Sequence, residues 1–143
     1  MARPPLPGVG DTIPTLRVDD IDADKIKIMA LVLRDPNPIH FDLDAVREAG
    51  LGDRVVNQGG VTMSYIVNML ATWTGSRAAI RNIDCRFNAN VFAGDSVEVG
   101  GTVTEVRQVD GETLADCEVW VRNDGAADPR PVVGGTATVA LRQ

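Results

Sequence analysis

Residues 55–76 read VVNQGGVTMSYIVNMLATWTGS and contain no charged side chain. Gly59 and Gly60 lie near the start of this stretch and Gly75 near its end, as glycines often do at helix boundaries. Polar residues such as Asn57 and Asn68 interrupt the apolar run, which falls short of the roughly 20 consecutive apolar residues of a transmembrane helix. A helix that is apolar on nearly all sides packs inside a protein. The stretch therefore predicts one long, buried central helix.

After Gly75 the apolar residues alternate with polar ones, the period-2 pattern of half-buried strands. Four stretches carry this pattern, at 83–91, 97–103, 117–121 and 133–141. Turn residues separate some of them, at Asp110-Gly111 and at 123–125. A fifth strand is expected near residues 15–18. One-sided alternation is typical of an antiparallel sheet with one face on the core, so the predicted class is α+β, a five-stranded antiparallel sheet wrapped around the central helix.

The segment before the central helix predicts shorter elements. Residues 1–14 are rich in Pro and Gly and indicate an extended lead-in. Acidic residues at 19–22 precede an apolar run at 25–33 and favour a helix start there. Pro36 and Pro38 end any helix and favour an extended turn. Residues 42–49 indicate a short helix that Gly50 stops.

Composition limits the possible functions. The 143 residues fit a single domain spanning 1–143, and 14 Lys+Arg against 20 Asp+Glu give a net charge of -6. Nucleic acid and membrane surfaces are poor partners for such an acidic chain. Cys85 and Cys117 lie in expected strands, and we interpret both as small buried hydrophobes of a reduced, cytoplasmic protein. The first residues lack the apolar segment of a secretory leader.

Asp35 and His40 are the strongest candidates for chemistry. His40 is the only histidine, and it lies five residues after Asp35 on a proline-stiffened segment. A stiff loop can hold an imidazole and a carboxylate at fixed separation, one as a base near neutral pH and the other as an acid or orienting group. A lone histidine with nearby Asp42 and Asp44 is a poor ligand set, so no metal is expected. The alternative is structural, with His40 bonded to a backbone carbonyl and Asp35 as a turn residue.

The run Asp35-Pro-Asn-Pro-Ile-His40, followed by Phe41-Asp42, resembles the hydratase motif of the MaoC-like enzymes. These are (R)-specific enoyl-CoA hydratases and 3-hydroxyacyl dehydratases with the hotdog fold. Residues 9–14, 58–63 and 93–97 resemble the opening segment, the head of the central helix and a later turn of the same family. The resemblance covers almost the whole chain.

The resemblance implies a role for five residues. Asp35 and His40 match the catalytic pair, and Asn37 matches the motif's Asn, which organises the loop. Gly59 matches the glycine whose backbone N–H polarises the thioester carbonyl. Gly60 replaces a larger apolar residue and is expected to widen the acyl pocket. In addition, Gln58 stands where the family commonly has His.

The implied reaction is syn addition of water to a trans-2-enoyl-CoA, or the reverse dehydration of an (R)-3-hydroxyacyl thioester, in lipid metabolism. The acyl-CoA is the substrate, and no cofactor is expected. The resemblance also implies a homodimer, or a heterodimer with another hotdog chain. Residues 55–59 and 73–75 are similar to small actinobacterial hydratases that act on steroid side-chain CoA thioesters with a partner chain.

Two other functions compete with hydration. A hotdog thioesterase would hydrolyse the thioester with a carboxylate-activated water, but such enzymes place the carboxylate near the central helix, and no Asp or Glu lies between Val55 and Ser76. A non-catalytic subunit would shape a pocket for a partner, but such subunits tend to lose the Asp-His pair that this chain keeps. Hydration is therefore the favoured function.

Overall fold

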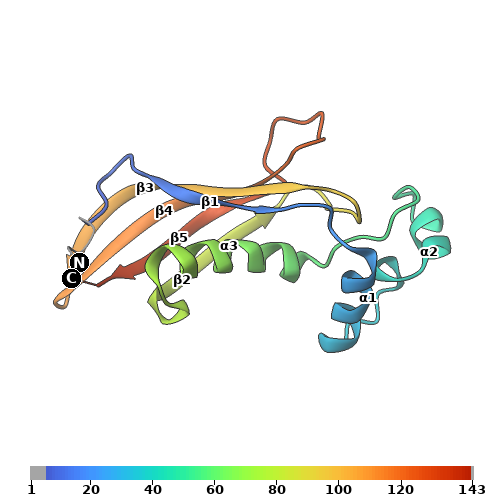
Figure 1. The fold of residues 1–143 in the computed structure, drawn as a ribbon, viewed down its shortest axis with the longest axis horizontal. Helices are drawn as coiled ribbons and strands as arrows, with labels where there is room; N and C mark the ends of the chain where they lie inside the picture. The colour runs from blue at the N-terminus through green and yellow to red at the C-terminus, as the bar shows by residue number, and fades with distance from the viewer. Residues whose placement is uncertain (1–5, 143) are drawn as a thin grey trace.

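The computed structural model describes residues 6–142 (Figure 1). Five strands and three α-helices, with two short 3₁₀ helices, follow one another as β1 (Thr12–Val18), α1 (Ala23–Val32), η1 (Pro38–His40), α2 (Leu43–Glu48), α3 (Gly59–Thr74), η2 (Arg77–Ala79), β2 (Ile80–Phe87), β3 (Val97–Val109), β4 (Glu112–Asn123) and β5 (Val133–Leu141). The expected lead-in at 1–14 is described only from residue 6 onward; residues 1–5 lie outside the described part.

The strands form one antiparallel sheet in the order β1-β3-β4-β5-β2. Asp110 and Gly111 join β3 to β4, with φ of 49° and 80°. Positive φ at both central residues is what a two-residue hairpin turn of type I′ requires, and Asp-Gly supplies it at low cost. The predicted turn and the predicted five-stranded antiparallel sheet are both confirmed.

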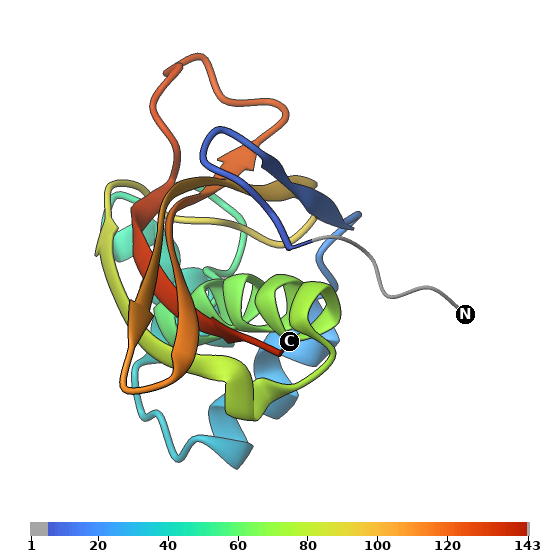
Figure 2. The same ribbon diagram turned by 90° about the vertical axis from the view of Figure 1, so that its left-hand side faces the viewer.

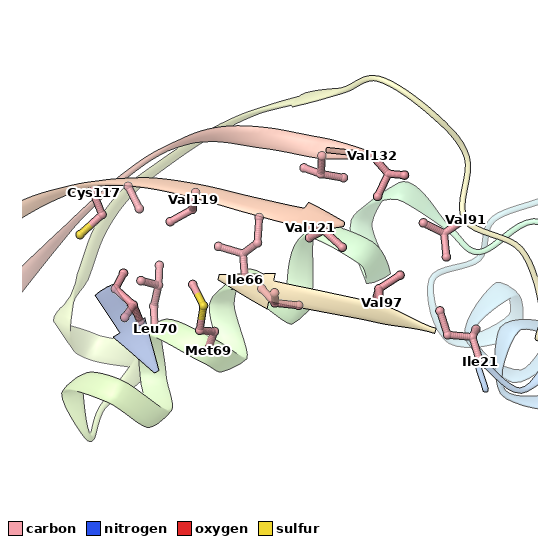
Figure 3. Close-up of a cluster of buried hydrophobic side chains, with 14 of the residues drawn as sticks. Ile21, Ile66, Met69, Leu70, Val91, Val97, Cys117, Val119, Val121 and Val132 are labelled. Atoms are coloured by element: carbon pink, nitrogen blue, oxygen red, sulfur yellow. The ribbon is translucent and has the colours of Figure 1, made fainter. Parts of the chain in front are cut away.

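The sheet curves around α3, as the two perpendicular views show (Figures 1 and 2). Ile66, Met69 and Leu70 of α3 are at most 1% exposed and face apolar strand residues such as Val119 and Val121 (Figure 3). This arrangement is the α+β hotdog fold. Helices α1 and α2 lie beyond the N-terminal end of α3 (Figure 1), so the segment that carries Asp35 and His40 is placed next to the head of the central helix.

Helix α3 begins at Gly59 and is followed by Gly75, which has φ of 83°, so the glycine boundaries are confirmed. Its burial is less complete than the sequence predicts. Only one stripe of the helix is fully buried, while Asn68 and Thr72 are exposed. The reason is geometric, because the sheet wraps only part of the circumference of the helix.

The first strand begins earlier than predicted, at Thr12 rather than residue 15. Its pairing with β3 shifts register between Ile13 and Leu16, around Pro14. Proline has no N–H to donate to the ladder, so an edge strand with an irregularity can accommodate it.

The strand after α3 ends at Phe87, four residues before the predicted end at Val91. The N–H of Asn88 donates to the Val132 carbonyl at 2.8 Å, and the Asn88 side chain donates to the Pro131 carbonyl at 3.0 Å. These two bonds end the pairing of β2 with β5. Val91 therefore lies in a loop rather than in the strand, and its side chain is buried there.

Helix α1 spans Ala23–Val32 and α2 spans Leu43–Glu48. Both ends of each helix lie within two residues of the predicted ends, which were 25–33 and 42–49. The predicted extended turn after Pro36 is wrong in part, because Pro38–His40 form a 3₁₀ turn capped by Asn37.

Of the two cysteines, Cys117 is buried as predicted but Cys85 is only half-buried, because β2 is an edge strand. Burial raises the pKa of the Cys117 thiol to about 11, and burial also raises that of Cys85. Among residues 6–142, no helix has the length and apolar character needed to cross a bilayer.

Candidate active site

Asp35 is placed by the way α1 ends. Arg34 follows the helix in the left-handed region, with φ of 52°. The N–H of Asp35 donates to the Ala30 carbonyl at 2.9 Å and that of Arg34 to the Leu31 carbonyl at 3.2 Å. These are the two bonds of a Schellman motif, in which the residue after the left-handed one is usually apolar. Here that position holds a carboxylate, which the helix end fixes in direction.

The loop from Asp35 to His40 is held by its own side chains. Oδ1 of Asp35 accepts from the Asn37 N–H at 3.0 Å, and Oδ1 of Asn37 accepts from the Ile39 N–H at 3.3 Å. Asn37 therefore caps the 3₁₀ turn that carries His40. Because Oδ1 of Asp35 is engaged in this way, Oδ2 is the oxygen left for chemistry.

His40 is 6% exposed and contacts Val56 and Asp35 through different ring nitrogens. Nδ1 lies 2.6 Å from the Val56 carbonyl, and Nε2 lies 3.2 Å from Oδ2 of Asp35. A carbonyl can only accept, so Nδ1 carries the proton and the lone pair of the neutral ring is on Nε2. The free lone pair thus faces the free carboxylate oxygen.

The distance of 3.2 Å between Nε2 of His40 and Oδ2 of Asp35 is that of a hydrogen bond in which one proton lies between the two atoms. Both atoms are acceptors when imidazole is neutral and the carboxyl ionised, so a favourable contact needs a proton on one of them. The Asp35 side chain is 32% exposed whereas that of His40 is 7% exposed. Solvent and ligands therefore reach the pair from the carboxylate side.

Gly59 is the first residue of α3 and is exposed. Gln58, at the N-cap position, makes no side-chain cap, and the N–H groups of residues 59–61 meet no acceptor in residues 6–142. Such free N–H groups at the positive end of a sixteen-residue helix can stabilise a developing negative charge.

The Asp-His loop and the head of α3 are tied together by backbone bonds. The Val56 N–H donates to the Ile39 carbonyl at 3.0 Å, and the Val56 carbonyl receives the His40 Nδ1 bond. Val56 is three residues before Gly59, a span of at most about 10 Å of chain. The Asp-His loop and the first residue of α3 therefore lie near one another.

Gln58, which stands where the family commonly has His, also links α1 to the head of α3. Its Nε2 donates to the Ile26 carbonyl of α1 at 2.8 Å, and the residue is 2% exposed. Its Oε1 is buried without a partner in the described residues. Gln58 therefore joins α1 to the start of α3 but leaves one acceptor unsatisfied.

Phe87 belongs to the stretch 83–91, in which the apolar residues of the alternating pattern are expected to face the core, but its side chain is 50% exposed. A Cβ built on Gly59 would lie 3.3 Å from Cε1 of its ring, so the Phe87 ring lies directly beside the exposed Gly59. A Cβ on Gly60 would meet nothing within 4 Å in the described residues. A wider acyl pocket at this position stays a prediction. No sequence pattern indicates the Phe87 contact, because it joins elements far apart in the chain.

Two features bear on rival chemistries. Helix α3 contains no Asp or Glu, so it lacks the carboxylate that a thioesterase is expected to carry near this helix. In residues 6–142 no three His, Cys, Asp or Glu side chains gather as metal ligands. The absence of a metal from the reaction stays a prediction.

Comparison with known families identifies the chain. Residues 8–122 match the family described as MaoC like domain. The chain belongs to the MaoC-like dehydratase family. The resemblance based on the Asp35–His40 motif is therefore confirmed. A search of curated proteins found no significant match.

Solved structures with the same fold include other MaoC-like proteins. A chain of the ChsH1-ChsH2 complex from Mycobacterium tuberculosis is 24% identical, with a TM-score of 0.79 over 96% of this chain and 100% of that one. The (R)-hydratase from A. caviae involved in PHA biosynthesis is 23% identical, with a TM-score of 0.80 over 94% and 97%. The MaoC-like dehydratase from Rhodospirillum rubrum is 22% identical, with a TM-score of 0.78 over 95% and 93%. At these identities the likeness shows the hotdog fold.

Proposed function

We propose that this MaoC-like protein is a hydro-lyase that adds water to trans-2-enoyl-CoA or, in reverse, dehydrates (R)-3-hydroxyacyl thioesters. The observation that carries the proposal is the pairing of Nε2 of His40 with Oδ2 of Asp35 at 3.2 Å, on a loop tied to the unsatisfied N-terminus of α3. A base, an acid and an anion-stabilising donor are the groups that this reaction needs.

In the proposed hydration, the Gly59 N–H donates to the thioester oxygen and stabilises the enolate charge that builds there. Nε2 of His40 removes a proton from water as the water oxygen bonds to the β-carbon. The carboxyl proton on Oδ2 of Asp35 passes to the α-carbon. Transfer of a proton from Nε2 to Oδ2, across the 3.2 Å contact, then restores the starting state.

Asn37 orients Asp35 in this scheme and does not react. The open space at Gly60 supports a wide acyl site. The scheme uses no metal or organic cofactor. Its place is in lipid metabolism, in the cytoplasm.

Strand β2 supports a dimer as the working form. Among residues 6–142 it pairs with β5 alone, and the order of the five strands leaves its other side at the edge of the sheet. Open edges with unpaired N–H and C=O groups favour pairing with another strand. The partner is a second copy or another hotdog chain, and the fold shared with a chain of the ChsH1-ChsH2 complex supports the second form, a heteromer acting on bulky CoA thioesters.

The test is turnover of trans-2-enoyl-CoA thioesters of different chain length and bulk, followed by loss of the enoyl absorbance. Asp35→Asn and His40→Gln should each lower kcat by about 10²- to 10⁴-fold, the usual contribution of an acid or base. Asp44→Asn is the matched control, because Asp44 is an exposed carboxylate on α2, and it should leave kcat unchanged.

Far-UV circular dichroism of each variant would show whether the fold is retained. Hydration that survives both Asp35→Asn and His40→Gln would refute the assigned roles. Release of free thiol without loss of the double bond would instead identify a thioesterase. No turnover by the chain, alone or with a hotdog partner, would contradict the proposed reaction.

A further inference from the structure

A hollow with a volume of about 380 Å³ lies between α1, the end of β1 and the first turns of α3. Most of its lining is apolar and includes Val18, Ile21, Ile28, Met29 and Val61. Two polar side chains of the α3 region also reach it, those of Asn57 and Tyr65. A mostly apolar hollow of this size with a few polar groups is typical of small-molecule sites.

This hollow is separate from the proposed acid-base pair, because neither member of the pair lines it. Lys25 and Met29 of α1 line the hollow, whereas Lys27 and Leu31 line a groove that includes Asp35. A step of two residues turns about 200° around an α-helix. The hollow and the groove therefore lie on opposite sides of α1.

Asn57 brings an unused hydrogen-bond acceptor to the hollow. The residue is 5% exposed, and its Nδ2 donates to Oγ1 of Thr62 at 2.9 Å and to the Tyr65 hydroxyl at 3.2 Å. These two bonds use both amide hydrogens and leave Oδ1 without a partner in residues 6–142. Oδ1 is not enclosed, since Oε1 of Gln58 is the one enclosed side-chain N or O atom of the described chain that lacks a partner. Oδ1 of Asn57 therefore opens into the hollow that this residue lines.

Tyr65 brings an unused donor to the same place. Its hydroxyl oxygen accepts from Asn57, and its own proton meets no acceptor in the described part of the chain. Burial raises the pKa of Tyr65, so the hydroxyl keeps this proton at neutral pH. One free donor and one free acceptor thus lie on two side chains that are already in contact. A hydroxyl group can satisfy both, because its oxygen accepts one hydrogen bond while its proton is donated in another.

The charges around the hollow disfavour an anionic ligand. Asp19, Asp20 and Asp22 are exposed residues of its lining, and Lys25 is the one cation among the lining residues. Arg17 pairs with Asp19 at 2.9 Å, which leaves two carboxylates against one ammonium group. This balance repels a carboxylate or a phosphate, and an apolar lining penalises any charge. A neutral ligand fits the hollow best.

We propose that this hollow is a second ligand site, apart from the acid-base pair, for a neutral apolar molecule that carries a hydroxyl group. The hydroxyl oxygen accepts from the Tyr65 O–H, and the hydroxyl proton is donated to Oδ1 of Asn57. The apolar body of the molecule packs against Ile28, Met29 and Val61. This site goes beyond the proposed hydration and does not depend on it.

The experiment measures Kd by isothermal titration calorimetry with menthol, menthone and menthanecarboxylate. The three probes share one hydrocarbon skeleton and carry a hydroxyl, a carbonyl and a carboxylate. Menthol should bind about two- to tenfold more tightly than menthone, because menthone can accept from Tyr65 but cannot donate to Asn57. Menthanecarboxylate should bind at least about tenfold more weakly than menthol, because it brings a charge into the hollow.

Tyr65→Phe should raise Kd for menthol by about two- to tenfold, the effect of one lost hydrogen bond. Ser64→Ala is the matched control, because it removes a hydroxyl from the neighbouring residue of the same helix. The Ser64 hydroxyl donates to the Val61 carbonyl at 2.6 Å, and Ser64 does not line the hollow. Ser64→Ala should leave Kd for menthol unchanged.

A second pair of variants locates the site. Ile28 is 56% exposed and lines the hollow, so Ile28→Trp should fill the space and abolish menthol binding without disturbing the core. Leu31 is 77% exposed on the same helix but lines the groove beside Asp35. Leu31→Trp should therefore leave Kd for menthol unchanged.

Absence of menthol binding would overturn the proposal, as would equal affinity for menthol and menthone. Equal losses in Ile28→Trp and Leu31→Trp, or in Tyr65→Phe and Ser64→Ala, would also overturn it. If Tyr65→Phe does not fold, the comparison of Ile28→Trp with Leu31→Trp decides. The readout is binding alone, so a failure of the proposed reaction would leave this result unaffected.

Discussion

Replacing Gln58 with methionine should make this protein more stable, although it removes a hydrogen bond. Gln58 is 2% exposed, its Nε2 donates to the Ile26 carbonyl at 2.8 Å, and its Oε1 has no partner in the described residues. A buried acceptor without a partner costs about 1–3 kcal/mol, whereas a typical hydrogen bond contributes about 0.5–1.5 kcal/mol. Ile26 lies inside α1, whose own ladder can still satisfy its carbonyl.

The expected net gain from Gln58→Met is therefore about 1 kcal/mol in the free energy of unfolding. For a chain of this length, that corresponds to a rise in Tm of about 3 °C. Methionine is unbranched and of similar length, so it fills the same space without a cavity. Urea unfolding followed by circular dichroism measures the change, and thermal unfolding checks it independently.

Gln58→Glu provides the opposite test at the same position. A carboxylate there would be buried beside the Ile26 carbonyl, so the variant should lose several kcal/mol. Tolerance of Glu would indicate that water reaches the site. A loss of more than about 1 kcal/mol in Gln58→Met would refute the reasoning, because it would show that Oε1 gains a stabilising partner in the working protein.

Three further changes test local features. Arg34→Gly should raise the free energy of unfolding by about 1 kcal/mol, because Arg34 has φ of 52°, a left-handed conformation that costs energy for a residue with a side chain. Arg47→Gly, within α2, should instead lower it by about 1 kcal/mol, and urea unfolding measures both. Gly135→Ala should destabilise by at least about 2 kcal/mol, since its Cβ would lie 1.9 Å from the Asp84 carbonyl oxygen, whereas Gly134→Ala meets only an ordinary contact at 3.5 Å; normal stability of Gly135→Ala would contradict the β2–β5 register. Iodoacetamide at mildly alkaline pH should modify Cys85 before Cys117, as mass spectrometry can show, because burial raises the pKa of Cys117 to about 11.

The sign of the pH effect at Cys117 follows from the same shift. Its thiol is neutral when folded, and burial raises its pKa from the ordinary value of 9.0 to about 11. Its contribution to stability is therefore fully present below pH 9 and is lost as the pH rises through about 11. Cys117→Ala should flatten this part of the stability profile measured by urea unfolding, and an unchanged profile would refute the assignment.

Local patterns in the sequence were enough to predict most of the elements. The glycines around α3 and the Asp110-Gly111 turn act through backbone conformations that depend on neighbouring residues alone. The limits that sequence analysis missed depend on contacts between distant segments. Strand β2 ends at Phe87 because Asn88 bonds to the segment before β5, and no local signal near residue 88 reveals this.

The candidate site shows the same division. The motif from Asp35 to His40 already predicts a carboxylate and an imidazole on one short loop, and Asn37 organises it through bonds of two residues' span. The orientation of the ring does not follow from the motif. It depends on the Val56 carbonyl, which is sixteen residues away and is a backbone group with no sequence signature.

By itself, the sequence determined the family, the antiparallel sheet, the central helix and the residues of the proposed acid-base pair. These depend on residue type, period and short-range spacing. Only the tertiary structure decided which nitrogen of His40 faces Asp35, that Gln58 joins α1 to α3, and that Lys27 shares a groove with Asp35. These relations arise from packing between segments, and a one-dimensional pattern holds no distances across the fold.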